Sequence, residues 1–145
     1  MKHILFLFCL GFLFSCGDDQ SGPDDITIME YLTEQNITNA TKTEDGIYFI
    51  PIFTSSSVEF PNINNTVTVD YVGYFLNDNI FDDGDDISFG LWQVIEGWQK
   101  GIPLLSKGSS GTLIIPSGLA YGSSGSGSIP GNTVLAFDVT LHDFD

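Results

Sequence analysis

The sequence of 145 residues predicts an α+β fold, a twisted antiparallel sheet with one short helix on one of its faces. Three observations predict this fold. Short segments rich in β-branched and aromatic residues recur after residue 45, and Gly, Pro, Asn or Asp separate them. One segment in the middle of this region has helical periodicity instead. The apolar content of 42% is also far above that of a disordered chain.

The first fifteen residues have the pattern of a secretory signal peptide. Lys2 precedes an apolar run from Ile4 to Phe14, which is shorter than the roughly 20 residues that a membrane-spanning helix needs. The run ends in Ser15-Cys16, which resembles a bacterial lipobox, where the Cys becomes the lipidated first residue of the mature chain. We therefore expect residues 1–15 to be a lipoprotein signal peptide and Cys16 to be lipidated. The alternative is plain secretion, with a Cys at this place by chance.

Residues 16–44 are predicted to form an acidic tether followed by a short helix. Residues 17–25 combine Asp with Gly and Pro, a composition that favours a flexible linker. An acidic stretch after a lipidated Cys also resembles the surface-export signal of lipoproteins in Bacteroidota, and an ordinary solvated linker is the alternative. The spacing of apolar residues over residues 26–39 then predicts a helix, with Thr27 as N-cap and Glu30 completing a capping box.

The remaining region, residues 45–145, is predicted to hold the strands of the sheet. Alternation of buried and exposed positions is clearest over residues 66–75, where Val67, Val69 and Tyr71 share one face. Pro51 places the segment 46–52 at a sheet edge or a strand end. The other predicted strands cover residues 80–82, 87–89, 111–116 and 133–141. The acidic residues 83–86 are predicted to form a turn.

The single helix of this region is predicted over residues 93–102. Val94, Trp98 and Ile102 recur every four residues and lie on one helix face. Gly97 and Gly101 weaken a helix by about 1 kcal/mol each relative to Ala, which indicates close packing or a short helix. A Gly- and Ser-rich loop follows over residues 123–132, either as disordered chain or as a mobile flap over a pocket.

Charge and composition exclude several classes of function. Four Lys, no Arg and 19 acidic residues give a formal net charge of −15, so no basic face can form for nucleic acid or for a polybasic membrane patch. Loss of His3 with the signal would leave His142 alone, without a partner set for a zinc site or a catalytic triad. The acidic run from Asp82 to Asp86 lacks the register of a Ca²⁺ loop, and a solvated turn is favoured over weak cation binding. We expect neither a metal nor a cofactor.

Five sequence segments occur in an order and spacing that together are specific. They are Val67-x-Val69-x-Tyr71-x-Gly73, Phe81-Asp82, Val94-Ile95-x-Gly97-Trp98, Ile115-Pro116-x-x-x-Ala120-Tyr121-Gly122, and Ile129-Pro130 followed by Leu135-x-Phe137-Asp138-Val139. Over residues 45–145 this combination resembles FKBP-type peptidyl-prolyl cis-trans isomerases. The resemblance implies an FKBP-like fold, a twisted antiparallel sheet wrapped around one short helix.

The resemblance also implies a shallow apolar pocket for a proline ring. Trp98 resembles the indole floor of that pocket, Tyr121 a hydroxyl that bonds a substrate carbonyl, and Asp82 a carboxylate that faces the substrate amide. The backbone N–H of Ile129 resembles the donor to the next carbonyl. Six further residues resemble the walls of that pocket, with Ile87 as the alternative to Phe89: Tyr71, Phe81, Phe89, Val94, Ile95 and Phe137. A basic residue often pairs with the Asp82 position in the family, and this chain has no Arg to do so.

Two functions from different classes follow. The first is an isomerase for Xaa-Pro bonds of secreted or envelope proteins, anchored in the cell envelope through Cys16, in the outer membrane with a periplasmic or surface orientation. Its partners would be proline-containing polypeptides, and macrolide inhibitors of the family would be further ligands. The second is a non-catalytic module that binds proline segments within an envelope assembly. Retention of the aromatic positions favours the enzyme, and loss of the basic partner of Asp82 favours the module.

Overall fold

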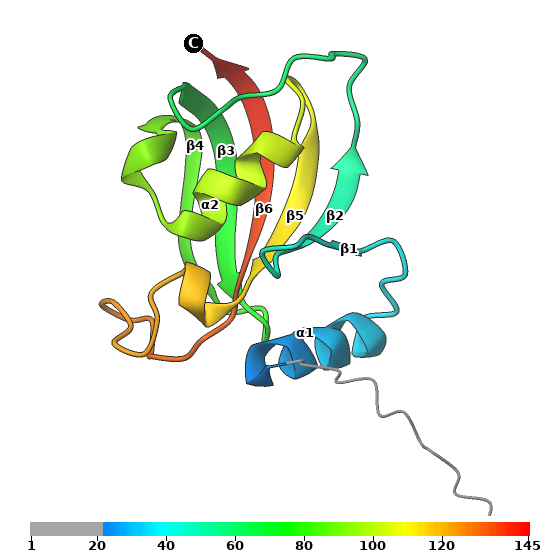
Figure 1. Ribbon diagram of the computed structural model, residues 1–145, viewed down its shortest axis with the longest axis vertical. Coiled ribbons are helices and arrows are strands. Elements are labelled where there is room, and N and C mark those ends of the chain that lie inside the picture. The colour runs from blue at the N-terminus through cyan, green and yellow to red at the C-terminus, as the bar shows by residue number, and fades with distance from the viewer. Residues whose placement is uncertain (1–21) are drawn as a thin grey trace, which may run out of the picture.

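A computed structural model describes residues 22–145 as a six-stranded antiparallel sheet crossed on one face by a short helix (Figure 1). The strands are β1 (Thr41–Lys42), β2 (Tyr48–Phe53), β3 (Thr66–Phe75), β4 (Ile80–Gly90), β5 (Ser110–Ile115) and β6 (Leu135–Phe144). Their order in the sheet is β1-β2-β5-β6-β3-β4. The helices are α1 (Pro23–Glu34) and α2 (Glu96–Gly101), with short 3₁₀ turns η1 (Leu91–Gln93), η2 (Ile102–Leu104) and η3 (Ser117–Leu119). The predicted α+β fold is confirmed.

The sheet has a hydrophobic cluster on each of its two faces. Successive residues of a strand point to opposite faces, so Leu113 and Ile115 face α2 while Ile114 faces the other side. The larger cluster lies between the sheet and α2 and includes the inward residues of β3 and β6. The smaller cluster receives Ile28 and Leu32 of α1. The domain therefore has a second helix, packed on the face opposite α2.

The helix α2 packs unusually close to the sheet because glycine faces the strands. A Cβ atom added to Gly97 would lie 2.3 Å from Cγ2 of Ile115, and one added to Gly101 would lie 2.7 Å from Cδ1 of Leu113. At both distances the strand side chain would have to shift to accommodate a Cβ atom. The helix is also shorter than the predicted 93–102. The 3₁₀ turn η1 comes before it, and the 3₁₀ turn η2, which contains Pro103, follows it directly. Close packing and a short helix therefore both apply.

The acidic residues 83–86 form part of a strand and not the predicted turn. The strand β4 is continuous over Ile80–Gly90, and its register against β3 shifts between the Tyr71↔Gly84 and Val69↔Ile87 pairs. This β-bulge places an extra residue in β4 and gives Asp86 a φ of 56°, while its N–H donates to Oδ1 of Asp70 at 2.7 Å. Because β4 is the last strand of the sheet, its aspartates stay in contact with water.

The helix α1 begins and ends earlier than the predicted 26–39. Pro23 occupies its first turn, where a missing N–H costs nothing, and Gly22 is the N-cap residue. The capping box at Thr27 is wrong, since the Thr27 hydroxyl lies inside the helix and donates to the carbonyl of Pro23 at 3.0 Å. Part of the segment predicted as an acidic tether, from Pro23 to Asp25, is therefore helical and docked on the sheet.

The predictions for the N-terminal segment fall largely outside the described residues. The signal peptide, the lipidation of Cys16 and the first part of the tether belong to residues 1–21, which the structure does not describe. Within residues 22–145, no helix is both long enough and apolar enough to cross a membrane.

Candidate active site

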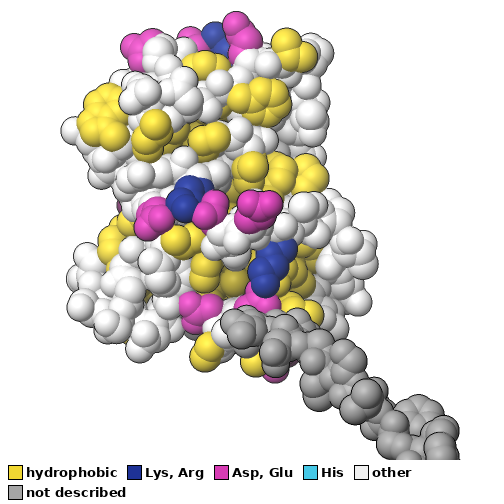
Figure 2. Space-filling view, viewed as in Figure 1, with side chains coloured by type: hydrophobic (Ala, Val, Ile, Leu, Met, Phe, Trp, Pro, Cys, Tyr) yellow, Lys and Arg dark blue, Asp and Glu magenta, His cyan; other side chains and the backbone are white. Residues whose placement is uncertain are grey.

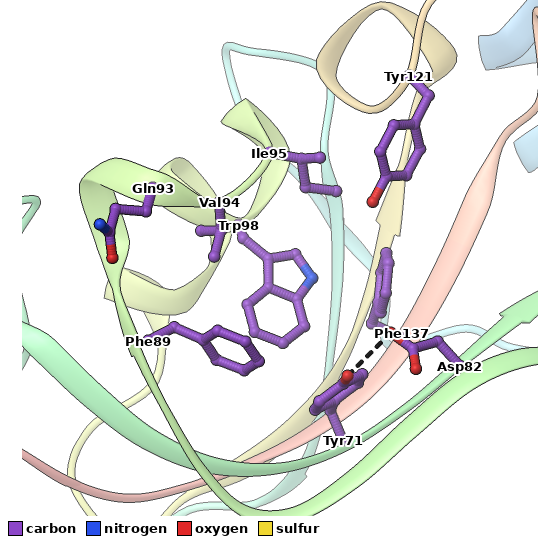
Figure 3. A pocket seen from close by; sticks show the side chains of 9 residues that line it. All are labelled: Tyr71, Asp82, Phe89, Gln93, Val94, Ile95, Trp98, Tyr121 and Phe137. Carbon is purple, nitrogen blue, oxygen red and sulfur yellow. Dashed lines mark hydrogen bonds between the residues drawn. The ribbon is translucent and has the colours of Figure 1, made fainter. Parts of the chain in front are cut away.

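A pocket of about 360 Å³ opens between the N-terminal end of α2 and the strands β3, β4 and β6. Figure 3 shows its side chains converging from these elements and from the loop after η3. The lining residues are Tyr71, Asp82, Phe89, Gln93, Val94, Ile95, Trp98, Tyr121 and Phe137. The structure thus brings together eight of the ten site residues predicted from sequence, which come from five separate segments of the chain.

Three aromatic rings stand nearly perpendicular to the indole of Trp98. The ring centroids of Tyr71, Phe89 and Phe137 lie 5.2, 5.6 and 5.4 Å from that of Trp98, with interplanar angles of 87°, 88° and 85°. Edge-to-face contacts of this kind add about 0.5–1.5 kcal/mol each beyond the burial of area. They fix the indole, which is 4% exposed, as the floor of the pocket.

The indole nitrogen of Trp98 is a buried donor that has no hydrogen-bond acceptor among the described residues. In Figure 3 this nitrogen points toward the side of the pocket on which Phe137 and Tyr121 lie. A buried unpaired N–H is uncommon in folded proteins and has a cost of about 1–3 kcal/mol. The N–H is therefore an unpaired donor beneath the surface of the pocket floor.

Asp82 is held by two donors of the chain itself. The hydroxyl of Tyr71 donates to its Oδ2 at 2.9 Å (Figure 3). The N–H of Asp83 donates to its Oδ1 at 3.0 Å. Burial of the ring, followed by the hydrogen bond to Asp82, raises the pKa of Tyr71 from 10.0 to about 12. The hydroxyl therefore stays protonated and keeps its donor role throughout the neutral range.

No lysine takes the place of the missing arginine beside Asp82. The three lysines of residues 22–145 pair with carboxylates elsewhere, Lys42 with Asp25 at 2.6 Å and Lys107 with Asp143 at 2.5 Å, while Lys100 pairs with both Asp45 and Glu96. Figure 2 shows lysine side chains next to acidic ones at three places on the face of the molecule that it displays. The hydroxyl of Tyr71 and a backbone amide thus provide the hydrogen bonds to Asp82.

Tyr121 lies at the mouth of the pocket and is 38% exposed. It follows η3, and its hydroxyl points toward Phe137 in Figure 3.

The structure also distinguishes between Phe89 and Ile87 as the wall residue. Phe89 contacts the floor and lines the pocket, whereas Ile87 is absent from the lining and 39% exposed.

Two of the predicted site residues do not line the pocket. Phe81 lies behind its wall, with its ring centroid 5.6 Å from that of Phe137 and 5.1 Å from that of Phe75. Ile129 is buried in the core, and its N–H already donates to the carbonyl of Ser126 at 2.9 Å. This N–H is committed inside the Gly- and Ser-rich loop, which closes on itself through a bridge between the same two residues.

Sequence reasoning missed Gln93 as a lining residue. It lies in η1 immediately before Val94, outside the helix face that the apolar periodicity identifies. A polar side chain at the rim of a pocket contributes to no hydrophobic pattern, so only its position next to Val94-Ile95 could have indicated it.

Comparisons with known proteins agree with this geometry. The family of FKBP-type peptidyl-prolyl cis-trans isomerases matches residues 57–142. The isomerase FkpA of Buchnera aphidicola is 37% identical over 123 residues, which cover 82% of this chain and 47% of that protein. FK506-binding protein 1 of Kluyveromyces lactis is 37% identical over 105 residues, covering 68% of this chain and 92% of that protein.

A solved structure supports the same conclusion at the level of the fold. The crystal structure of FkpA from Escherichia coli superposes with a TM-score of 0.75 at 30% identity, over 87% of this chain and 61% of that one. The fold and the matched family model define an FKBP-type domain, and the predicted FKBP-like architecture is confirmed. This chain belongs to the FKBP-type peptidyl-prolyl cis-trans isomerase family. It spans a little under half the length of the FkpA relative from Buchnera.

Proposed function

We propose that this protein catalyses cis–trans isomerisation of Xaa-Pro peptide bonds in polypeptides of the cell envelope. The observation that carries the proposal is the pocket itself. A space of about 360 Å³, floored by Trp98 and walled by aromatic rings, suits a proline ring and offers no group that would react with it covalently.

The mechanism that we propose is preferential binding of the twisted amide. Rotation about a peptide bond has a barrier of ~18–20 kcal/mol because resonance must be lost. Uncatalysed prolyl isomerisation takes tens to hundreds of seconds. A turnover near ~10² s⁻¹ would require roughly 5–6 kcal/mol of preferential stabilisation of the twisted state. An apolar pocket contributes to this because it disfavours the planar amide, which is the more polar form.

The polar groups of the pocket then orient the flanking backbone. The hydroxyl of Tyr121 is exposed at the mouth and can donate to a substrate carbonyl. The carboxylate of Asp82, fixed by Tyr71, borders the space in which the rotating amide would lie. Its negative charge would face the carbonyl carbon, where positive charge increases as resonance is lost.

We further propose that the protein works in the cell envelope, lipidated at Cys16 and attached to the outer membrane. The sequence supports this through the apolar run of residues 4–14 that ends in Ser15-Cys16. The clients would then be secreted or envelope proteins with Xaa-Pro bonds. The name of the relative FK506-binding protein 1 suggests that macrolides of the FK506 type would occupy the same pocket.

The test is cis–trans exchange of an Xaa-Pro peptide, measured by NMR with the fragment that starts at Gly17. We expect wild type to enhance exchange and Trp98→Ala to abolish most of the enhancement. Tyr121→Phe should lower it by roughly tenfold, as expected for one hydrogen bond made in the transition state. A wild-type protein that does not enhance exchange would overturn the proposed isomerase activity. An active wild type whose activity neither substitution changes would overturn the assignment of Trp98 and Tyr121 to the active site.

One observation favours the second candidate, a binding module with little turnover. The N–H of Ile129 is already bonded to Ser126, so a substrate could use it only by displacing that bond. A module of this kind would bind a proline peptide with normal affinity and show no exchange enhancement. Titration of the same peptide, followed by amide chemical shifts of the pocket residues, separates the two functions.

A further inference from the structure

The helix α1 is bonded directly to the segment that leads into the pocket. Oδ2 of Asp24 accepts two hydrogen bonds from Ser117, one from its backbone N–H at 2.7 Å and one from its hydroxyl at 2.6 Å. These residues are 93 positions apart in the sequence. Ser117 is buried and begins η3, the turn that immediately precedes Ala120-Tyr121.

Asp24 acts as the cap of this turn. The N-cap position of η3 is Pro116, which makes no side-chain cap bond. The first N–H groups of a helical turn need acceptors, and a carboxylate is a favourable one. The carboxylate comes from another part of the chain, and α1 holds it rigidly because Ile28 is fully buried in the second core.

Ser117 in turn fixes the backbone on both sides of Tyr121. Its carbonyl accepts the N–H of Ala120 at 3.1 Å and the N–H of Gly122 at 2.8 Å. Tyr121 itself is 38% exposed, so packing constrains its ring less than it constrains a buried ring such as that of Trp98. The path from α1 to the pocket therefore consists of Asp24, Ser117 and the two amides that flank Tyr121.

We propose that Asp24 is a positioning residue for Tyr121, which makes α1 a working part of the active site. The proposal rests on the isomerase function proposed above and on the role of the Tyr121 hydroxyl in it. Asp24 also lies outside residues 57–142, the part of the chain that matches the family. The N-terminal segment would thus supply a support that the matched domain does not contain.

The first test compares Asp24→Ala with Asp25→Ala. Asp25 is a matched control because it docks the same helix through the hydroxyl of Tyr48, at 2.7 Å, and through Lys42, at 2.6 Å, whereas the N–H and hydroxyl of Ser117 both donate to Asp24. We expect kcat/KM for an Xaa-Pro peptide to fall roughly 5- to 20-fold in Asp24→Ala, as loss of one to two hydrogen bonds implies. It should change less than about twofold in Asp25→Ala. Asp24→Asn, which keeps one acceptor oxygen, should retain intermediate activity.

The second test separates positioning from a general loss of stability. If Asp24 acts through Tyr121, Asp24→Ala should lower kcat/KM by less than about twofold in the Tyr121→Phe variant. A loss of kcat/KM that is equally large in wild type and in Tyr121→Phe would overturn the proposal. So would equal losses in Asp24→Ala and Asp25→Ala.

A readout without turnover keeps the inference separate from the proposed function. In Asp24→Ala, the NMR signals of the Tyr121 ring should shift and the Gly122 amide should exchange with solvent faster, whereas Asp25→Ala should leave both unchanged. An inactive wild type would overturn the isomerase function alone. Unchanged Tyr121 and Gly122 signals in Asp24→Ala would overturn the positioning role, whatever the activity.

Discussion

The close approach of α2 to the sheet predicts that Gly97→Ala destabilises the protein although it improves the helix. The added Cβ would lie 2.3 Å from Cγ2, 2.8 Å from Cδ1 and 3.1 Å from Cγ1 of Ile115. Carbon atoms prefer separations of about 3.5–4.0 Å, so the nearest contact is too short by more than about 1 Å. Ile115 is fully buried and cannot move aside into solvent.

The magnitude follows from two opposing effects. Overpacking of a core by one methyl group costs about 1–3 kcal/mol, and this overlap belongs at the upper end of that range. Replacing Gly by Ala within a helix returns about 1 kcal/mol. We therefore expect the free energy of unfolding to fall by about 2 kcal/mol. Because Trp98 follows Gly97, the same displacement of α2 should also raise KM for a proline peptide.

The assay is urea unfolding followed by Trp fluorescence, with two further variants as controls. Gly118→Ala is a matched control, because a Cβ there would meet nothing within 4 Å, and its stability should stay within about 0.5 kcal/mol of wild type. Ile115→Ala removes all three clashing atoms, so adding Gly97→Ala to it should cost nothing further. Wild-type stability in Gly97→Ala alone would refute the reasoning.

Three further predictions concern single side chains. Tyr71→Phe, which removes the 2.9 Å hydrogen bond to Asp82, should lower the unfolding free energy by about 1 kcal/mol in urea titrations; an unchanged midpoint would mean that the bond contributes nothing net. The pKa values of Tyr48 and Tyr71 are both raised from 10.0 to about 12, so the stability that they contribute is complete below pH 10 and is lost as pH rises toward 12. Unfolding midpoints measured from pH 8 to 11.5 should show this loss, and Tyr71→Phe should make it smaller. Thr27→Ala should change stability by less than about 0.5 kcal/mol, because its hydroxyl bonds Pro23 inside the helix; a loss of about 1 kcal/mol would restore Thr27 as a cap.

Local patterns predicted the regular parts of the fold well. The alternation over residues 66–75 predicts β3 with its observed bounds, since one face of this strand is buried along its length. The bulge in β4 has no such signal, because four aspartates in a strand resemble a turn until a neighbouring strand is known. The start of α1 was misplaced for a related reason. The Gly and Pro content of residues 17–25 favours a linker, although a first-turn Pro such as Pro23 is compatible with a helix.

The candidate site was predicted in a different way. Tyr71, Trp98 and Phe137 would each be core residues in any protein of this class, and only the family resemblance, which their joint spacing with Tyr121 supports, implies a pocket. Contacts that depend on three-dimensional closure could not be predicted. The committed N–H of Ile129 depends on how its loop folds back on Ser126, and no periodicity encodes that.

The two ends of the sheet bear on how the protein would meet unfolded client chains under the proposed function. An open strand edge next to an extended client invites the client to add as a further strand, which is how aggregates begin. At one end, the aspartates and the bulge of β4 disfavour such pairing by charge and shape. At the other end, β1 covers only Tyr48 and Phe49 of β2. Beyond them, Pro51 has no backbone N–H to donate, and its carbonyl already accepts a hydrogen bond from the side chain of Asn39 at 3.5 Å. Clients would thereby be confined to brief contact at the pocket and would not be incorporated into the sheet.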